Sequence, residues 1–270
     1  MAGLSPPVVA ALPIGVPGSA APGTYAAAVL SDADVAALHD LLNPWDPEHH
    51  PADAFQHRLV MAAGAVLDVG CGTGAMLHRA RDAGHRGVLA GIDPNPAYLT
   101  RARRRDDIEW VLGTAATTPW EQEFDLAVMT GHAFQCLVDD GEIRAGLAGV
   151  RAALREGGRF AFETRHPQAH AWEDWTPAHA SEVVDAGGRL LRVSHEVESV
   201  VDDVVTFTET VTDASGAAVH YERQVLRFLG PEVLNRLLRE AGYRIDEQYG
   251  DWHGGPLTPD SREIVTVARR

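Results

Sequence analysis

The feature that most constrains the fold is a glycine-rich segment at residues 66–74, which reads VLDVGCGTG. The apolar residues around Asp68 predict a short strand, and the alternate glycines Gly70, Gly72 and Gly74 predict a loop that leads into a helix. Glycine serves such a loop where the chain turns tightly, where a ligand approaches the backbone, and where the helix packs closely on the strand. The segment therefore predicts a binding site for a nucleoside-bearing cofactor.

The spacing of the glycines separates two kinds of cofactor. Dinucleotide sites favour G-x-G-x-x-G, which directs a helix N-terminus at a pyrophosphate. Here the spacing is G-x-G-x-G, and Asp68 lies just upstream. A second strand, expected over residues 87–92, is followed by Asp93, about 20 residues beyond Gly74, the distance at which a βαβ unit places an acid against ribose hydroxyls. This spacing disfavours an NAD-dependent oxidoreductase. S-adenosylmethionine (SAM) suits it, because SAM has an ammonium group and no phosphate.

At these residues the chain resembles the class I SAM-dependent methyltransferases, in particular small actinobacterial-type enzymes that act on small molecules. The resemblance extends to the stretches at residues 43–45, 124–135 and 159–165, which read NPW, FDLAVMTGHAFQ and RFAFETR. It covers roughly residues 60–164 and the last helix and two strands. It implies a Rossmann-like fold, with SAM as cofactor and S-adenosyl-L-homocysteine as product, but it implies no substrate.

Alternating strand and helix signals predict an α/β fold with a doubly wound, mostly parallel sheet of seven strands. The strands are expected at residues 65–69, 87–92, 108–112, 124–129, 159–164, 244–249 and 263–268. The helices are expected to span residues 31–42, 51–63, 75–83, 95–104, 140–155 and 231–241, the fifth of them closed by the glycines at 157 and 158. After an irregular stretch at residues 165–188, three alternating runs predict an antiparallel β insertion over the active site, at residues 190–200, 204–212 and 219–228. Residues 213–216 supply its hairpin turn.

These signals divide the chain into five segments. They are a flexible N-terminal arm (1–24), an N-terminal helical lid (25–64), the SAM-binding core (65–164), an antiparallel β insertion that caps the substrate (165–229), and a C-terminal helix and strands that complete the core (230–270).

The charge balance limits the kinds of partner that the chain is expected to bind. There are 23 Lys and Arg residues against 38 Asp and Glu residues, a net charge of −15, which disfavours nucleic acid because phosphate contacts need clustered basic residues. A neutral or cationic small-molecule acceptor suits the negative electrostatic field of such a chain better than a polyanion does. Two cysteines cannot build a disulfide framework, and there is neither a signal peptide pattern nor an apolar run long enough for a membrane. We expect a cytoplasmic monomer or homodimer.

The resemblance assigns cofactor contacts residue by residue. It implies that Asp68 and the loop hold the methionine portion, that Asp93 takes the ribose hydroxyls, and that Thr114 and Ala115 line the adenine. Asp93 has an alternative role as a capping residue, and Thr114 as a turn residue. Tyr25 is expected either to cover the sulfonium or to anchor the arm. The full expected set is Tyr25, Asp68, Gly70, Cys71, Gly72, Gly74, Asp93, Pro94, Thr114, Ala115, Met129 and Thr130.

Two residues depart from the pattern of these relatives. Thr114 replaces the usual acidic residue that accepts a bond from the adenine amino group, and a hydroxyl accepts more weakly than a carboxylate. His166 stands where relatives often have asparagine, and histidine is a base near neutral pH where asparagine is not.

Three residues are catalytic candidates. His132 follows an expected strand end and is equally compatible with contacting the reacting groups or with a structural bond to backbone. Glu163 and His166 are expected to face the same cleft, with His166 accepting a proton and Glu163 orienting it or binding a substrate cation. The commoner interpretation of His166 is an ordinary surface histidine that precedes a proline. The proline also argues against a helix that would align His166 with His170 on a metal, and we expect no metal.

Aromatic residues in the second half of the chain are candidates to line the substrate pocket, with ordinary core packing as the alternative. They are Trp172, Trp175 and Trp252, with His253 as a secondary base. The resulting hypothesis is a SAM-dependent methyltransferase that modifies N or O of a small molecule in specialised metabolism. Two alternatives stay open: a non-methylating cyclisation or elimination with His166 and Glu163 as acid and base, and a SAM-binding protein without turnover. Fold alone cannot choose among them.

Overall fold

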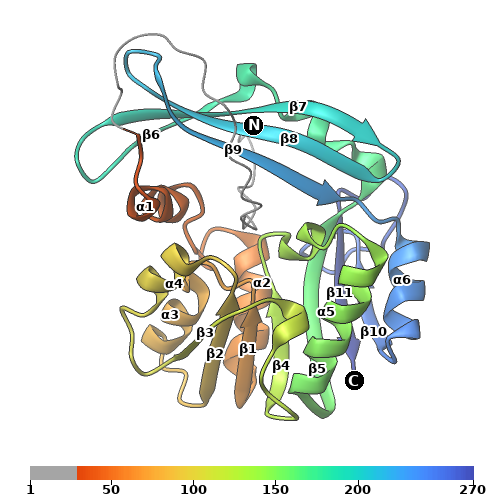
Figure 1. Cartoon of the computed structure of the whole chain (residues 1–270). Coiled ribbons are helices and arrows are strands. Elements are labelled where there is room, and N and C mark those ends of the chain that lie inside the picture. Colours follow the sequence, from red (N-terminus) through yellow and green to blue (C-terminus); the bar gives the residue numbers. More distant parts are fainter. Residues whose placement is uncertain (1–28) are drawn as a thin grey trace.

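The computed structural model of the chain describes residues 29–270 (Figure 1). Its centre is a seven-stranded sheet in the order β10-β11-β5-β4-β1-β2-β3. The five strands from β3 to β5 are parallel, whereas β11 runs antiparallel to both β5 and β10. The predicted doubly wound α/β sheet is therefore confirmed. The strands are β1 (Ala65–Val69), β2 (Val88–Asp93), β3 (Glu109–Leu112), β4 (Phe124–Met129), β5 (Leu154–Arg165), β10 (Arg244–Tyr249) and β11 (Glu263–Arg269).

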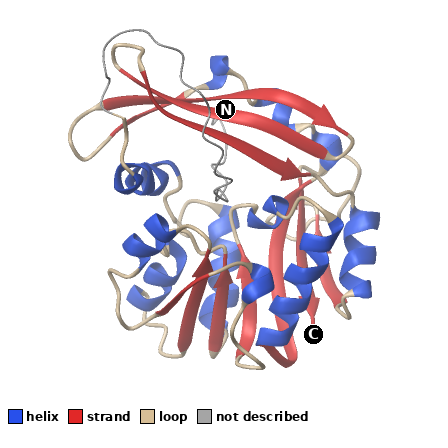
Figure 2. Ribbon diagram, in the orientation of Figure 1, coloured by secondary structure: helices blue, strands red, loops and turns tan. Residues whose placement is uncertain are grey.

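Helices cover both faces of this sheet (Figure 2), because its central strands are apolar on both sides. One face packs on α5 and α6, and the other on α2 and α3. Helix α1 begins with a capping box in which Ser31 and Asp34 exchange hydrogen bonds. It is held to α4 by Asp40, whose Oδ2 accepts from Nε of Arg101 at 2.9 Å. The helices are α1 (Asp32–Leu42), α2 (Pro51–Ala62), α3 (Ala75–Asp82), α4 (Pro96–Ala102), α5 (Asp140–Ala153) and α6 (Pro231–Glu240).

A second, antiparallel sheet in the order β6-β7-β8-β9 extends above the main sheet, on the side where β1, β2 and β4 end (Figure 1). We call it the roof sheet. The predicted hairpin turn is present, with the Gly216 N–H donating to the Asp213 carbonyl at 2.9 Å. The strands are β6 (Ser181–Val184), β7 (Leu190–Val201), β8 (Val204–Asp213) and β9 (Ala218–Arg227).

Two local predictions were wrong. The fifth helix ends at Ala153 and is not closed by the glycine pair. Strand β5 starts at once because Leu154, fully buried, pairs with Phe124, and the next registered pair is Arg159 with Leu126. Gly157, with φ of 73°, belongs to the bulge between these pairs. Also, the stretch expected to be irregular contains β6, whose exposed and half-buried residues alternate along the edge of the roof sheet.

The predicted arm at residues 1–24 and Tyr25 lie outside the described residues, and the five-segment division stays a prediction. None of the helices found in residues 29–270 has the length and apolar character needed to cross a bilayer.

Candidate functional site

The glycine loop connects β1 to α3 at the carboxyl edge of the main sheet. Gly70 and Gly74 have φ of 75° and 80°, in the left-handed region that glycine occupies at little cost. A Cβ on Gly74 would lie 2.5 Å from Cη2 of Trp110. Close packing, and not only the turn, therefore requires glycine at the start of α3.

Asp68 lies within β1 and is buried, with 1% of its surface exposed. Its Oδ1 has no hydrogen-bond partner among the described residues. Burial, and then the charges of Asp93 and Glu163, raise the pKa of Asp68 to about 8. A buried carboxylate oxygen without a partner is costly, and an ammonium group at this position would satisfy it. The site therefore fits the α-ammonium of SAM.

Asp93 ends β2, as predicted. Its Oδ2 accepts from the Gly72 N–H and its Oδ1 from the Asn95 N–H, each at 2.8 Å. Burial raises its pKa to about 6, against the lowering effect of these two bonds. The carboxylate thus caps backbone and also lines a pocket. Each oxygen can accept a further hydrogen bond from a ribose hydroxyl.

This small pocket has a volume of about 330 Å³ and a mostly apolar lining, which suits a purine ring. Thr114 lies on its wall, and the Thr114 N–H donates to Oγ1 of Thr117 at 2.8 Å. Its lining also includes Ala133, Leu137 and Glu142, which no sequence signal predicted. Those residues lie in and after a 3-10 helix that had no glycine signal. The predicted residues that line the pocket are Gly70, Asp93, Pro94, Thr114, Ala115 and Met129.

Not every loop residue faces this pocket. Cys71 packs with Leu99, Ala102 and Trp110, and burial raises its pKa well above the ordinary value. Gly72 contributes its N–H to Asp93. The loop therefore acts partly by holding β1, β2 and α3 together.

A large cleft of about 730 Å³ lies beside these groups. Glu163, 3% exposed, occupies its wall near the end of β5. Its Oε1 accepts from the His132 N–H at 3.0 Å, and its Oε2 from Nε2 of Gln56 at 3.1 Å. Burial raises the pKa of Glu163, and the neighbouring His132 and these bonds act in the opposite direction. The predicted residues that line the cleft are Thr130, His132, Glu163, Trp175 and Trp252.

His132 is held from two sides. Its backbone has φ of 62°, and its Nε2 lies 2.9 Å from Oε2 of Glu263, the first residue of β11. An Nε2–H that donates to Glu263 leaves a lone pair on Nδ1, a buried atom that has no partner among the described residues. The imidazole is therefore oriented by a carboxylate and can accept a proton.

Arg165 is a cleft residue that the sequence analysis gave no role. It is 3% exposed, and its Nη1 donates to Oε1 of Gln135 at 3.0 Å. Its guanidinium lies over Trp175, 5.3 Å from the ring centroid. Burial lowers its pKa to about 10, and its Nη2 has no partner in residues 29–270. Its only sequence signal was its place at the end of the RFAFETR stretch.

Three predicted residues lie away from the cleft lining. His166 is buried, and its Nδ1 accepts from the Gln168 N–H at 3.2 Å, while burial lowers its pKa. Trp172 packs on Phe228, with ring centroids 4.7 Å apart. His253 lines a separate depression of about 290 Å³ together with Trp252. The structure therefore brings His132, and not His166, into contact with Glu163.

Comparisons with known proteins agree with this geometry. Residues 66–158 match a family model described as a methyltransferase domain. The cypemycin N-terminal methyltransferase of a Streptomyces species is 25% identical over 240 residues, which cover 84% of this chain and 87% of that protein. SAM-bound CalS10, an amino pentose methyltransferase from Micromonospora echinaspora, has a TM-score of 0.62 at 23% identity and covers 91% of this chain and 100% of its own. The sugar N-methyltransferase KedS8 from Streptoalloteichus sp. has a TM-score of 0.63 at 19% identity, with coverages of 95% and 100%.

The fold and the site thus define a class I methyltransferase architecture. Residues 66–158 carry a methyltransferase domain, and the pocket beside Asp68 and Asp93 fits SAM as its cofactor.

Proposed function

We propose that this chain methylates the nitrogen of a primary or secondary amine on a small-molecule acceptor in specialised metabolism. The observation that carries the proposal is the cleft beside Glu163, where carboxylates and indole rings lie together. Glu163, Glu263, Asp53 and Asp174 line it with Trp45, Trp175 and Trp252. Arg165 and Arg262 line it too, so the four carboxylates outnumber the guanidinium groups. Carboxylates and aromatic faces both attract an ammonium group.

The names of three similar proteins support an amine acceptor. One is an N-terminal methyltransferase, one acts on an amino pentose, and one is a sugar N-methyltransferase. These substrates belong to those proteins. What they share is a nitrogen nucleophile, and the acidic cleft of this chain is suited to one.

When bound, SAM supplies a methyl group activated by a sulfonium. The residues of this chain position the acceptor and control its proton. In this proposal Asp68 and Asp93 hold the ammonium and ribose groups of the cofactor, and the carboxylates of the cleft attract the acceptor amine. An amine attacks only through its free lone pair, so His132, oriented by Glu263, would take the proton. Correct alignment in such a site is worth about 7–11 kcal/mol.

The non-methylating alternative has less support. It requires His166 and Glu163 to work as a pair, but His166 caps a 3-10 turn at Gln168 and does not line the cleft.

The test is incubation with methyl-labelled SAM and a panel of amino sugars, peptide N-terminal amines and phenols, followed by mass spectrometry. The expected result is one labelled methyl group on an amine. The matched control is Asp68→Asn, which should bind SAM about 10–100-fold more weakly and give less product at the same SAM concentration. Product on phenols alone would replace N with O as the acceptor atom. SAM binding without methylated product from any panel member would support the alternatives.

A further inference from the structure

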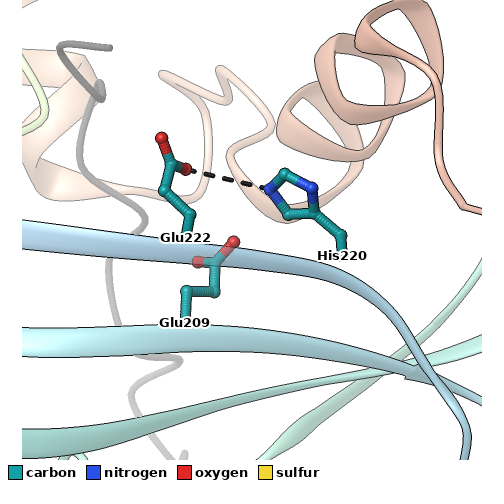
Figure 3. A group of neighbouring side chains, drawn as sticks. All are labelled: Glu209, His220 and Glu222. Atoms are coloured by element: carbon teal, nitrogen blue, oxygen red, sulfur yellow. Dashed lines mark ion pairs between the residues drawn. The ribbon is translucent and has the colours of Figure 1, made fainter. Parts of the chain in front are cut away.

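Three side chains that favour metal ions meet on the roof sheet. Glu209 belongs to β8, and His220 and Glu222 belong to β9. One ligand atom from each lies within 4.8 Å of the other two, and Figure 3 shows the three side chains on the same side of the ribbon. None of them lines the small pocket or the large cleft.

The strand register creates this group. Glu209 pairs directly with Glu222, and His220 lies two residues before Glu222 on the same face of β9. That face is the inner one: Glu209 is 5% exposed and alternates with the buried Phe207 and Val211, while His220 and Glu222 on β9 are half-buried. Like charges opposite each other on neighbouring strands are destabilising, and burial of ionised carboxylates adds to the penalty. Two opposed glutamates on an inner face therefore call for a compensating positive charge.

The neighbouring side chains supply little of that charge. In the part of the chain that the structure describes, the ion-pair partners of the two glutamates are histidines alone. Nε2 of His195 lies 3.1 Å from Oε2 of Glu209. Nε2 of His220 is 4.0 Å from Oε2 of Glu222, too far for a hydrogen bond. This His220 nitrogen is buried and has no hydrogen-bond partner among residues 29–270.

The geometry points to a divalent metal site, suited to Zn²⁺, formed by Glu209, His220 and Glu222. Two carboxylates and one imidazole are a donor set that Zn²⁺ accepts, and a dipositive ion balances both carboxylates. Zinc bonds of about 2.0–2.2 Å allow two ligand atoms to be at most ~4.4 Å apart. Small rotations of the flexible glutamates therefore close the present 4.8 Å separation.

His195 completes the arrangement from outside. It contacts Glu209 and so orients a ligating carboxylate, as partners of metal ligands commonly do. The bound ion would fasten β8 to β9 and strengthen the roof sheet. This site is independent of methyl transfer and draws on none of the residues proposed for it.

The experiment uses the full chain, treated with EDTA and desalted, and Zn²⁺ as the probe. The expected result is one tightly retained equivalent by elemental analysis after gel filtration, and a rise in Tm of roughly 5–10 °C at a hundredfold excess over the Kd. Glu222→Gln and His220→Asn should each weaken the affinity measured by calorimetry at least tenfold. His195→Asn should weaken it by about 10–100-fold.

Glu196→Gln is the matched control, because it removes one carboxylate from β7 at an exposed position of the same sheet. It should bind Zn²⁺ like the wild type. Glu222→Gln keeps the side-chain shape and relieves the opposed charges, so it should fold, which circular dichroism checks. The proposal is overturned by the lack of a stoichiometric equivalent in the wild type. Equal affinities for the wild type and both ligand variants would overturn it as well.

Discussion

Nε2 of His132 and Oε2 of Glu263 lie 2.9 Å apart, although 131 positions separate the two residues in the chain. The contact joins the loop after β4 to the first residue of β11 and holds the imidazole beside Glu163. A hydrogen bond at one ring nitrogen fixes the tautomer at the other, so this contact orients the imidazole as the proposed role of proton acceptor requires.

Replacing His132 with asparagine tests this role. Asparagine tolerates the left-handed backbone at this position, and the backbone N–H to Glu163 is kept. We expect kcat to fall by about 10²-fold or more, the usual contribution of a positioned acid or base, with SAM affinity by calorimetry little changed. Glu263→Gln should lower kcat less than His132→Asn does, and it should change kcat more than KM. Unchanged kcat in His132→Asn would remove this histidine from catalysis.

Asp68→Asn should weaken SAM binding by about 10–100-fold, because a hydrogen bond to a charged group contributes about 1.5–3 kcal/mol. Calorimetry with SAM is the measurement, and S-adenosylhomocysteine, which keeps the ammonium group, should lose affinity to a similar extent. Glu196→Gln, on the exposed side of β7, should bind like the wild type. If Asp68→Asn bound SAM with wild-type affinity, the assignment of Asp68 to the ammonium group would be wrong.

The same residue predicts a pH dependence of stability in the ligand-free protein. Its pKa is raised from 3.8 to about 8, so between these values the native state binds the proton more tightly than the unfolded state. The free energy of unfolding should therefore decline as the pH rises through this window. Asp68→Asn removes that decline. Its Tm should exceed that of the wild type at pH 8, by about 2–4 °C for each kcal/mol relieved, and the gap should close towards pH 4. A gap that is constant with pH would argue against the raised pKa.

Local signals predicted the cofactor half of this site, because its groups lie near one another in the sequence. The glycine loop, Asp68 and Asp93 come from one βαβ unit, whose geometry is standard. The cleft was predicted less well, because its side chains come from helices and strands that are far apart in the sequence. Gln56 of α2 contacts Glu163, and Glu263 of β11 contacts His132. Both contacts depend on tertiary packing, which no local sequence pattern predicts. His166 shows the reverse case: its sequence position predicted a place in the cleft, but its ring accepts from the Gln168 N–H and does not line the cleft.

Gly74→Ala tests the close packing at the start of α3. The new Cβ would lie 2.5 Å from Trp110, at a backbone φ of 80°, so both steric overlap and backbone strain are expected. We expect a loss of about 2–5 kcal/mol in the free energy of unfolding, measured with urea. Gly84→Ala is the matched control, because its φ is 94° but no atom lies within 4 Å of the new Cβ. It carries the strain alone and should lose about 1–2 kcal/mol. Equal losses would mean that Trp110 gives way.

Arg165 offers a test of how the cleft orients its acceptor. Its Nη2 is buried without a partner among the described residues and lies at the cleft wall, so we expect it to bind an oxygen of the acceptor. Arg165→Lys keeps the charge but loses the planar fork that contacts Gln135 and stacks on Trp175. KM for the amine should rise about tenfold, with a smaller change in kcat and none in SAM affinity. Because removal of a buried charge can also destabilise the fold, the Tm of the variant is measured alongside. A fall in kcat at constant KM would instead place Arg165 among the groups that act on the transition state alone.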